Sequence, residues 1–359
     1  MRRALLPMLL ATALLATGLL ATALVASGPA GAGSGSGGTP SSGPMSIVQL
    51  GDSVAAGEGT LYGYTYDTSS REWTGGNLDA TWPGPHPLCH DSPDAYGNRV
   101  AAHFGAELTQ LACTGATFDN GIAKPEVSDG TTYSPAQFGD WAKQTDLNAR
   151  YDAAKPDLVL VTLGADDLNF HGVVEECIKN GYEYFLDLAD LACTSKNPGS
   201  TIKQDVFDVL PQLADNYATL VAWIGQRAKA NDQPTPKIVF TNYADPLPPN
   251  GAKCPDTSYL YPKQTRYLVK LVSMLNARIE SAIDGIDDAG VALADISSAY
   301  TPRGVSHRWC SDDPWSYGLS IIRVTDPFSF ESQAPFHPTP AGQESIAELV
   351  VPAVAKLFG

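Results

Sequence analysis

The sequence predicts an α/β fold, a single three-layer α/β/α domain with a parallel five-stranded sheet. Short apolar runs alternate with longer segments of helical periodicity, and the strand runs carry few polar residues, as expected when helices bury both faces of a sheet. The predicted strands are 46–50, 107–112, 157–163, 237–242 and 291–296. The predicted helices are 94–104, 205–230, 262–284 and 341–358. Long loops are expected at 60–92, 118–136, 170–200, 245–262 and 298–336.

The N-terminal segment indicates export. Two arginines precede an apolar run at 4–26, and Ala30 and Ala32 match the small-x-small pattern of a signal-peptidase site. An uncleaved run would instead keep the chain on the membrane as a single anchor. The predicted regions are a signal peptide at 1–32, a flexible Gly/Ser-rich linker at 33–44 and the folded domain at 45–359.

The net charge and the cysteine content limit the partners, cofactors and metal sites that we expect for this chain. A formal net charge of −16 repels phosphate backbones, so we expect no nucleic-acid partner. We expect a secreted monomer without cofactor or metal. A metal site built from His86, Cys89 and His90 is the alternative, but an exported chain favours disulfides. Sequence alone does not choose the pairing of the six cysteines, which are Cys89, Cys113, Cys177, Cys193, Cys254 and Cys310.

Four short segments carry residues that could take part in catalysis or binding. Ligands of parallel sheets bind at the carboxyl ends of strands. Ser53 follows the first predicted strand in Gly-Asp-Ser, Gly115 follows the second in Cys-Thr-Gly, and Asp166 follows the third in Gly-Ala-Asp-Asp. His337 precedes the last predicted helix, for which Thr339 is the expected N-cap. Each residue taken alone also fits an ordinary turn or cap.

Together the residue types suit nucleophilic catalysis. A serine hydroxyl attacks well only when a base takes its proton, and an imidazole with a pKa near ~6.5 can do so at neutral pH. Gly115 lets the backbone approach a ligand and present its N–H group to a developing oxyanion.

In this order, the four segments resemble the GDSL (SGNH) hydrolase family, and the resemblance covers essentially all of 45–359. It implies a flavodoxin-like α/β/α fold and a lipase or esterase that cleaves carboxylic esters. It also implies that Ser53 is the nucleophile and His337 the general base. The oxyanion hole would be formed by Ser53, Gly115 and Asp166.

The flanking segments are similar to the actinobacterial secreted lipases of this family. They are Cys-His-Asp-Ser at 89–92 and Cys-Ser-Asp-Asp-Pro-Trp at 310–315. The resemblance implies three sequential disulfides, Cys89–Cys113, Cys177–Cys193 and Cys254–Cys310.

The chain departs from the family pattern at two positions. Ala334 stands where the family has the acid of Asp-x-x-His, so we expect the Ala334 main-chain carbonyl to orient His337, as in the similar lipases. Asp166 stands where the family has an asparagine that donates to the oxyanion. A protonated Asp166 would donate in its place, whereas an ionised one would repel negative charge.

The sequence argues against two other classes of hydrolase and leaves two alternative functions open. The Gly-x-Ser-x-Gly of α/β-hydrolases is absent from this chain. Paired acids such as Glu175-Glu176 share no framework that would indicate a glycosidase. A sugar or polysaccharide O-deacetylase on the same fold is the enzymatic alternative. A lipid- or glycan-binding pseudoenzyme is the alternative that Asp166 supports. Membrane contact would be transient, or would run through an uncleaved N-terminal segment.

Overall fold

The computed structural model describes one unit of the chain within Ser41–Gly359. Residues 1–42, which hold the predicted signal peptide and nearly all of the predicted linker, lie outside the described residues, as does Ala334. The described residues are 43–77, 80–83, 86–128, 130–139, 146–185, 193, 202–248, 254, 259–319 and 335–359.

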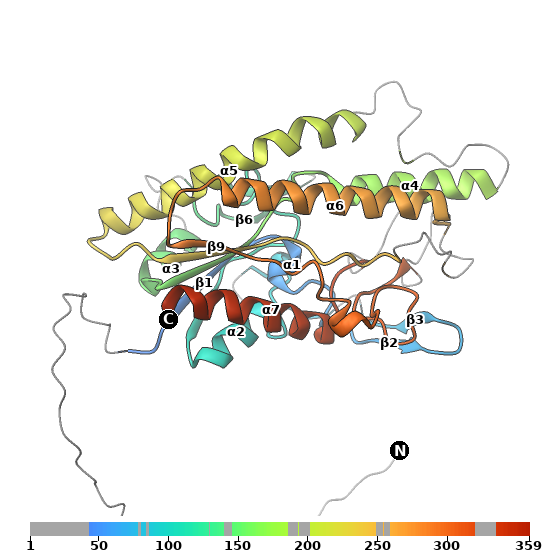
Figure 1. The fold of residues 1–359 in the computed structure, drawn as a ribbon, viewed down its shortest axis with the longest axis horizontal. Coiled ribbons are helices and arrows are strands. Elements are labelled where there is room, and N and C mark those ends of the chain that lie inside the picture. The colour runs from blue at the N-terminus through green and yellow to red at the C-terminus, as the bar shows by residue number, and fades with distance from the viewer. Residues whose placement is uncertain are drawn as a thin grey trace, which may run out of the picture. The chain divides into compact units, whose positions relative to one another are not determined.

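The predicted parallel five-stranded sheet is confirmed (Figure 1). Its order is β4-β1-β7-β8-β9, and every neighbouring pair is parallel. The chain therefore runs from β1 to β4 on one side and then returns past β1 to β7 on the other side. This reversal places a topological switch point at β1. The strands are β1 (Ser46–Gly51), β4 (Glu107–Gln110), β7 (Leu158–Thr162), β8 (Lys237–Thr241) and β9 (Val291–Ala294).

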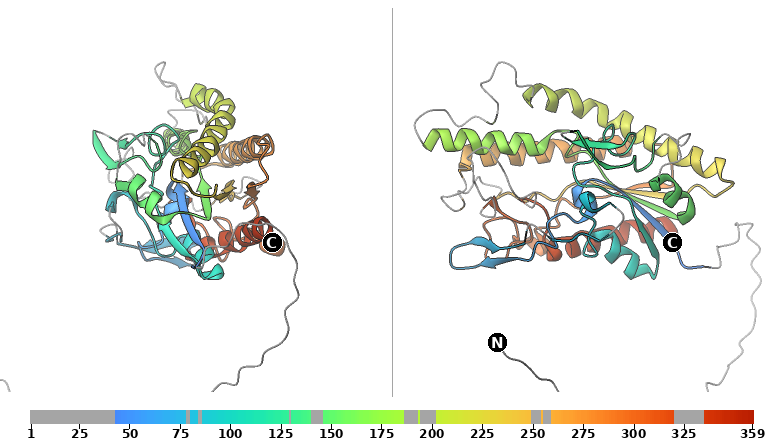
Figure 2. Two further views of the ribbon diagram at one scale, coloured as in Figure 1. Left: turned by 90° about the vertical axis from the view of Figure 1, so that its left-hand side faces the viewer. Right: turned by 180° about the vertical axis from the view of Figure 1, so that it is seen from behind.

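Successive side chains along each strand point to opposite faces of the sheet, so the core has two halves. Val159 and Val161 of β7 pack on one face of the sheet, and Leu158 and Leu160 pack on the other. Two layers of helices cover these faces (Figures 1 and 2). The first face carries α5 (Ile202–Ala230) and α6 (Pro262–Asp284), and the second carries α2 (Tyr96–Phe104) and α7 (Pro340–Phe358).

Several predicted loops contain regular structure. The expectation of a loop at 170–200 was wrong in its first half, which forms α4 (Phe170–Phe185). Two glycines and a pair of acids interrupt its apolar pattern, although Val173 and Cys177 are buried one turn apart. The structure also contains further elements that the sequence did not predict. They are α1 (Ser53–Ala56), α3 (Asp146–Ala154), the hairpin β2 (Tyr64–Asp67) and β3 (Glu72–Gly75), the hairpin β5 (Glu126–Ser128) and β6 (Thr131–Ser134), and the 3-10 turns η1 (Pro87–Cys89) and η4 (Pro302–Gly304).

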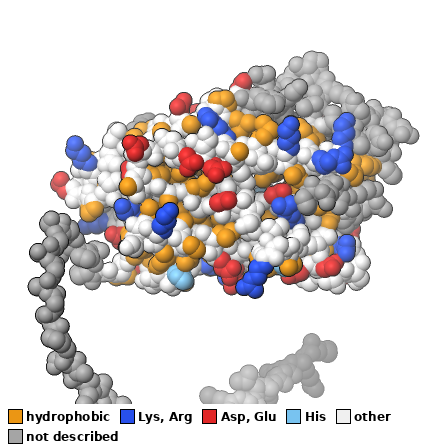
Figure 3. Space-filling model, in the orientation of Figure 1, with side chains coloured by type: hydrophobic (Ala, Val, Ile, Leu, Met, Phe, Trp, Pro, Cys, Tyr) orange, Lys and Arg blue, Asp and Glu red, His pale blue; other side chains and the backbone are white. Residues whose placement is uncertain are grey.

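The structure contains the disulfide pairs that the resemblance implied, Cys89–Cys113, Cys177–Cys193 and Cys254–Cys310. On the face shown in Figure 3, acidic and basic side chains are interspersed with apolar ones. Within the part of the chain that the structure describes, no helix combines the length and the apolar character needed to cross a membrane.

Gly51, the last residue of β1, has a backbone that only glycine tolerates well. Its φ is +136°, and a Cβ there would lie 2.1 Å from the Thr162 carbonyl oxygen. We expect Gly51→Ala to lower the free energy of unfolding by about 3 kcal/mol or more, because the contacted atom is backbone and cannot move aside. Urea denaturation measures the loss.

Gly63→Ala is the matched control. Gly63 also has a positive φ, +68°, but a Cβ there would have no neighbour within 4 Å. The control should lose only the backbone strain, about 1–2 kcal/mol. Equal losses in the two variants would show that the close approach of β1 and β7 does not constrain the fold.

Candidate active site

Ser53 lies at the turn between β1 and α1. Asp52 caps this helix, and its carboxyl accepts a hydrogen bond of 3.0 Å from the Val54 N–H. The Asp52 N–H donates to the Thr162 carbonyl at 3.0 Å, which ties the turn to the end of β7. Ser53 is therefore held by backbone contacts to the central strand rather than by a free loop.

A tyrosine joins three strand ends beneath the turn. The Tyr243 hydroxyl, just beyond β8, donates to Asp52 Oδ2 at 2.5 Å and accepts from the Ala165 N–H at 3.0 Å. Burial raises the pKa of Asp52 to about 7, although the bond from Tyr243 opposes this shift. This bridge fixes the segment of Asp166 relative to the segment of Ser53.

His337 is placed by a short antiparallel contact ahead of α7. The Phe336 N–H donates to the Tyr317 carbonyl at 2.9 Å, and the Tyr317 N–H donates to the His337 carbonyl at 3.0 Å. Thr339 is the N-cap of α7, as predicted, and its side chain accepts from the Gly342 N–H at 3.2 Å. Both sides of the histidine are thus anchored by the backbone.

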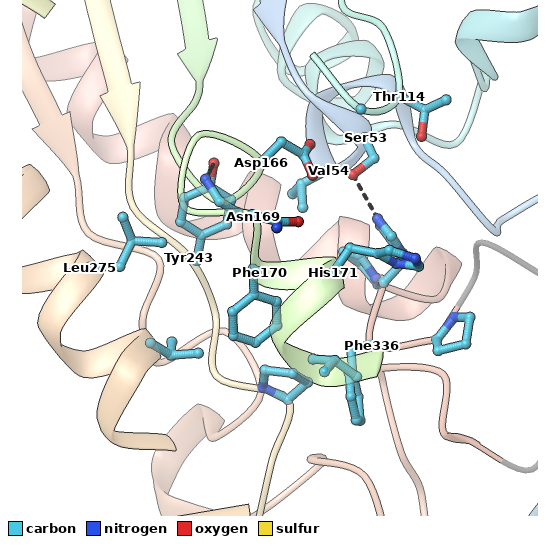
Figure 4. Close-up of a pocket in the computed structure, with 18 of the residues that line it drawn as sticks. Ser53, Val54, Thr114, Asp166, Asn169, Phe170, His171, Tyr243, Leu275 and Phe336 are labelled. Carbon is cyan, nitrogen blue, oxygen red and sulfur yellow. Dashed lines mark hydrogen bonds between the residues drawn. The ribbon is translucent and has the colours of Figure 1, made fainter. Parts of the chain in front are cut away.

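The two sequence-distant residues meet. His337 Nε2 lies 2.6 Å from Ser53 Oγ, and this hydrogen bond is drawn as a dashed line in Figure 4. Both residues line a cavity of about 530 Å³. Gly115 and Asp166 line the same cavity, so the structure brings all four predicted residues together.

The cavity is polar beside Ser53 and mainly apolar farther along, where His171 and Glu175 also line it. Thr114 and Asp166 lie beside Ser53, whereas Phe170, Leu275 and Phe336 lie farther along (Figure 4). Helices α4 and α6 supply much of the apolar side, and they are joined by a buried hydrogen bond from Gln264 of α6 to the Cys177 carbonyl of α4. The apolar lining comprises Val54, Phe170, Val174, Ile178, Pro246, Val272, Leu275, Leu319 and Phe336.

Gly115 lies at the end of the segment that follows β4. Its φ is +84°, and a Cβ there would lie 3.0 Å from Glu126 Oε1. The segment is held on both sides, because the Cys113 N–H donates to the Gly51 carbonyl at 3.0 Å and the Thr114 N–H to the Cys89 carbonyl at 3.1 Å. Glycine thus permits a close approach between the backbone and the cavity.

Asp166 is the unusual member of the group. Its Oδ2 is shielded from solvent and has no hydrogen-bond partner among the described residues. Burial raises the pKa of Asp166 well above its ordinary value, and the nearby Asp52, Asp167 and Glu126 raise it further. These shifts favour the protonated form of the carboxyl, which is the form that can donate a hydrogen bond.

Sequence reasoning missed two acids next to this site. Glu126 of β5 is 2% exposed and lines the cavity, and burial raises its pKa to about 8. Glu58 is fully buried just after α1. No short sequence pattern around either acid indicates a place at the site. Glu126 lies in a predicted loop, and the residues that surround Glu58 come from distant parts of the chain.

The alternative metal site is contradicted. Cys89 is bonded to Cys113, and His90 contacts Glu58 through its Nδ1 at 2.5 Å. Within the described ranges, no group of three or more His, Cys, Asp or Glu side chains is arranged to hold a metal ion.

Comparison with known proteins points to one family. Residues 50–344 match the model of the GDSL-like Lipase/Acylhydrolase family. No curated protein matches the sequence.

Solved structures resemble the chain at low identity. The extracellular lipase of Streptomyces rimosus is 21% identical with a TM-score of 0.45, over 87% of this chain and 99% of that chain. Phospholipase A1 of Streptomyces albidoflavus is 20% identical with a TM-score of 0.47, over 88% and 99%. A carbohydrate esterase family 2 enzyme of Corynascus thermopiles (Myceliophthora fergusii) is 16% identical with a TM-score of 0.44, over 89% and 69%.

Proposed function

This chain belongs to the GDSL-like lipase/acylhydrolase family, and we propose that it is a secreted hydrolase of carboxylic esters with Ser53 as nucleophile and His337 as general base. The observation that carries the proposal is the 2.6 Å hydrogen bond between Ser53 Oγ and His337 Nε2 on the wall of a cavity. Disulfides, which persist in oxidising compartments, support export.

The geometry supports a two-step acyl transfer. Ser53 Oγ attacks the ester carbonyl carbon as His337 Nε2 takes the hydroxyl proton. The tetrahedral intermediate collapses when its C–O bond to the alcohol breaks and His337 returns the proton to the leaving oxygen. Water then attacks the acyl-Ser53 ester while His337 accepts a proton from it. The bond to Ser53 Oγ breaks as His337 returns this proton to Oγ, and the carboxylic acid leaves.

Three donors would stabilise the oxyanion. The backbone N–H groups of Ser53 and Gly115 supply two, and the protonated carboxyl of Asp166 supplies the third. We retain the Ala334 carbonyl as the proposed acceptor for the second ring nitrogen of His337. Together these groups form a Ser-His dyad with an oxyanion hole.

The first prediction concerns the reactivity of Ser53. A fluorophosphonate probe reacts with a serine only when a base activates it, so the wild type should be labelled at Ser53. Ser53→Ala should lose labelling and ester turnover, and His337→Ala should lose most of both. Mass spectrometry of the labelled peptide locates the adduct. A folded wild type that takes up no probe would contradict catalysis and favour a binding role.

The second prediction concerns the pH dependence of turnover. A carboxyl with a raised pKa donates only while it stays protonated, so wild-type kcat/KM should fall as pH rises through the pKa of Asp166. Losing one oxyanion donor costs about 10²–10³ in rate. Asp166→Asn keeps an N–H donor at every pH and should abolish this high-pH limb.

Asp167→Asn is the matched control for that profile. Asp167 is the next residue, and its carboxyl accepts from the Phe118 N–H at 3.0 Å. Its variant should still show a high-pH limb, moved to lower pH because the charge of Asp167 helps to raise the pKa of Asp166. A limb that persists unchanged in Asp166→Asn would reject the protonated donor.

The apolar wall indicates an acyl chain of several carbons. Val174 of α4 is 8% exposed and lines this wall. We expect Val174→Phe to reduce turnover of long-chain nitrophenyl esters at least about tenfold while short-chain turnover persists, because each blocked CH₂ loses about 0.8 kcal/mol of binding. Val174→Ala is the size control and should not shorten the preferred chain.

The same substrate series separates a lipase or esterase that binds longer acyl chains from the alternative, a sugar or polysaccharide O-deacetylase. If wild-type turnover peaks at acetyl esters and Val174→Phe leaves the profile unchanged, the apolar wall does not bind the acyl group. Release of acetate from acetylated glycans would then favour the O-deacetylase.

A further inference from the structure

Glu58 is a fully buried acid held against the nucleophile's own turn. Its N–H donates to the Ser53 carbonyl at 3.0 Å, as does the N–H of Gly57. Gly57 makes the turn possible with a φ of +90°. The backbone thereby fixes Glu58 at a set position relative to Ser53.

The carboxyl of Glu58 has polar partners in place of water. His90 Nδ1 lies 2.5 Å from its Oε2, and the hydroxyl groups of Tyr62 and Thr114 also interact with it. Burial alone would raise the pKa of Glu58, but the His90 hydrogen bond, the charges of His90 and His337 and the Thr114 hydroxyl lower it below its usual range. Glu58 is therefore a buried carboxylate ion, to which His90 donates.

The partners of Glu58 are themselves rigid. The ring of His90 stacks on Trp82, with centroids 4.6 Å apart. The preceding residue, Cys89, is bonded to Cys113, and the Cys89 carbonyl accepts from the Thr114 N–H. Thr114 lines the cavity together with Ser53 and His337, so it forms a wall shared by the catalytic cavity and the Glu58 site.

Glu58 differs from the other buried acids near the cavity in the direction of its pKa shift. The acids that line the cavity are Asp166, Glu126 and Glu175. Burial raises the pKa of Asp166 and of Glu126, to about 8 for Glu126, whereas Glu175 pairs with Lys179 of the same helix at 2.7 Å. Asp52 beneath the turn has its pKa raised to about 7. Among the described acids packed around the cavity, Glu58 is the one whose pKa is lowered. The remaining titratable groups on the cavity wall are His171, Tyr133, Tyr243 and Tyr300.

His337 needs such a charge. It becomes a cation whenever it holds the Ser53 proton, and Ala334 stands where the family supplies an acid. A carboxylate in a site of low dielectric stabilises a nearby cation much more than one in water does. On the basis of the proposed function, we propose that Glu58 is a positioning residue that stabilises the His337 imidazolium through space, in place of the missing acid.

Glu58→Gln tests this in the full chain, because it preserves the size of the side chain and removes its charge. We expect kcat on a short-chain nitrophenyl ester to fall about tenfold or more, with KM little changed. The acidic limb of kcat/KM reports the protonation of His337 in the free enzyme. Without the carboxylate, the imidazolium is less stable, so this limb should move to lower pH by about half a unit to one unit.

Glu58→Asp and Asp91→Asn are the controls. Glu58→Asp keeps the charge and should leave the acidic limb nearer to its wild-type position than Glu58→Gln does. Asp91 is a buried acid beside His90, but it does not line the cavity. Its variant should keep the wild-type limb. An acidic limb that stays in place in folded Glu58→Gln overturns the proposal, since a merely structural role would change stability and not the titration of His337.

A second variant covers the case in which Glu58→Gln does not fold. His90→Asn retains an N–H donor near Glu58 but removes the imidazole whose interactions lower the pKa of the acid, so burial should favour its neutral form and the acidic limb should again move to lower pH. An unmoved limb in folded His90→Asn also overturns the proposal. Labelling of wild-type Ser53 by the fluorophosphonate separates the two failures, because an unlabelled wild type rejects the proposed function, whereas a labelled one rejects only the role of Glu58.

Discussion

The close approach of β1 and β7 at Gly51 is the constraint on which the site depends. Gln137 is fully buried and holds this point from the side, since it accepts from the Gly51 N–H and donates to the Gly51 carbonyl, both at 2.8 Å. With β1 held there, the N–H of Asp52 reaches the Thr162 carbonyl and Ser53 begins its helix at the switch point of the sheet. Ser53 therefore lies on a rigid scaffold, which favours a precise hydrogen bond to a histidine from the other end of the domain.

Electrostatics divide the acids around this scaffold into two groups. Burial raises the pKa of Asp52, Asp166, Asp167 and Glu126, because the loss of hydration disfavours the charged carboxylate. Glu58 alone of these acids has hydrogen bonds and electrostatic interactions with histidines that outweigh the cost of burial. The pKa shifts thus favour negative charge on Glu58 and the neutral form of Asp166 and Glu126 on the cavity wall.

Local patterns in the sequence predicted much of this arrangement. The five strands and the cap of α7 follow from short apolar runs and from Thr339-Pro340, which are signals contained within a few residues. Helix α4 was missed because glycines and paired acids obscure its period. The environment of Glu58 was not predictable, since its partner His90 is 32 residues away, and Tyr243 and Asp52 are 191 residues apart. Such contacts exist only after the sheet has formed.

The two departures from the family pattern are best understood together. In the usual family pattern an acid stands three residues before the histidine, and an asparagine donates to the oxyanion. Here Ala334 stands at the first of these sequence positions and Asp166 at the second. If the carboxylate of Glu58 serves the imidazolium and Asp166 keeps its proton, negative charge still lies on the side of the cation and a neutral donor on the side of the anion. The transition state depends on this distribution of charge rather than on the residue types that provide it. Catalysis can therefore persist although both family residues are replaced.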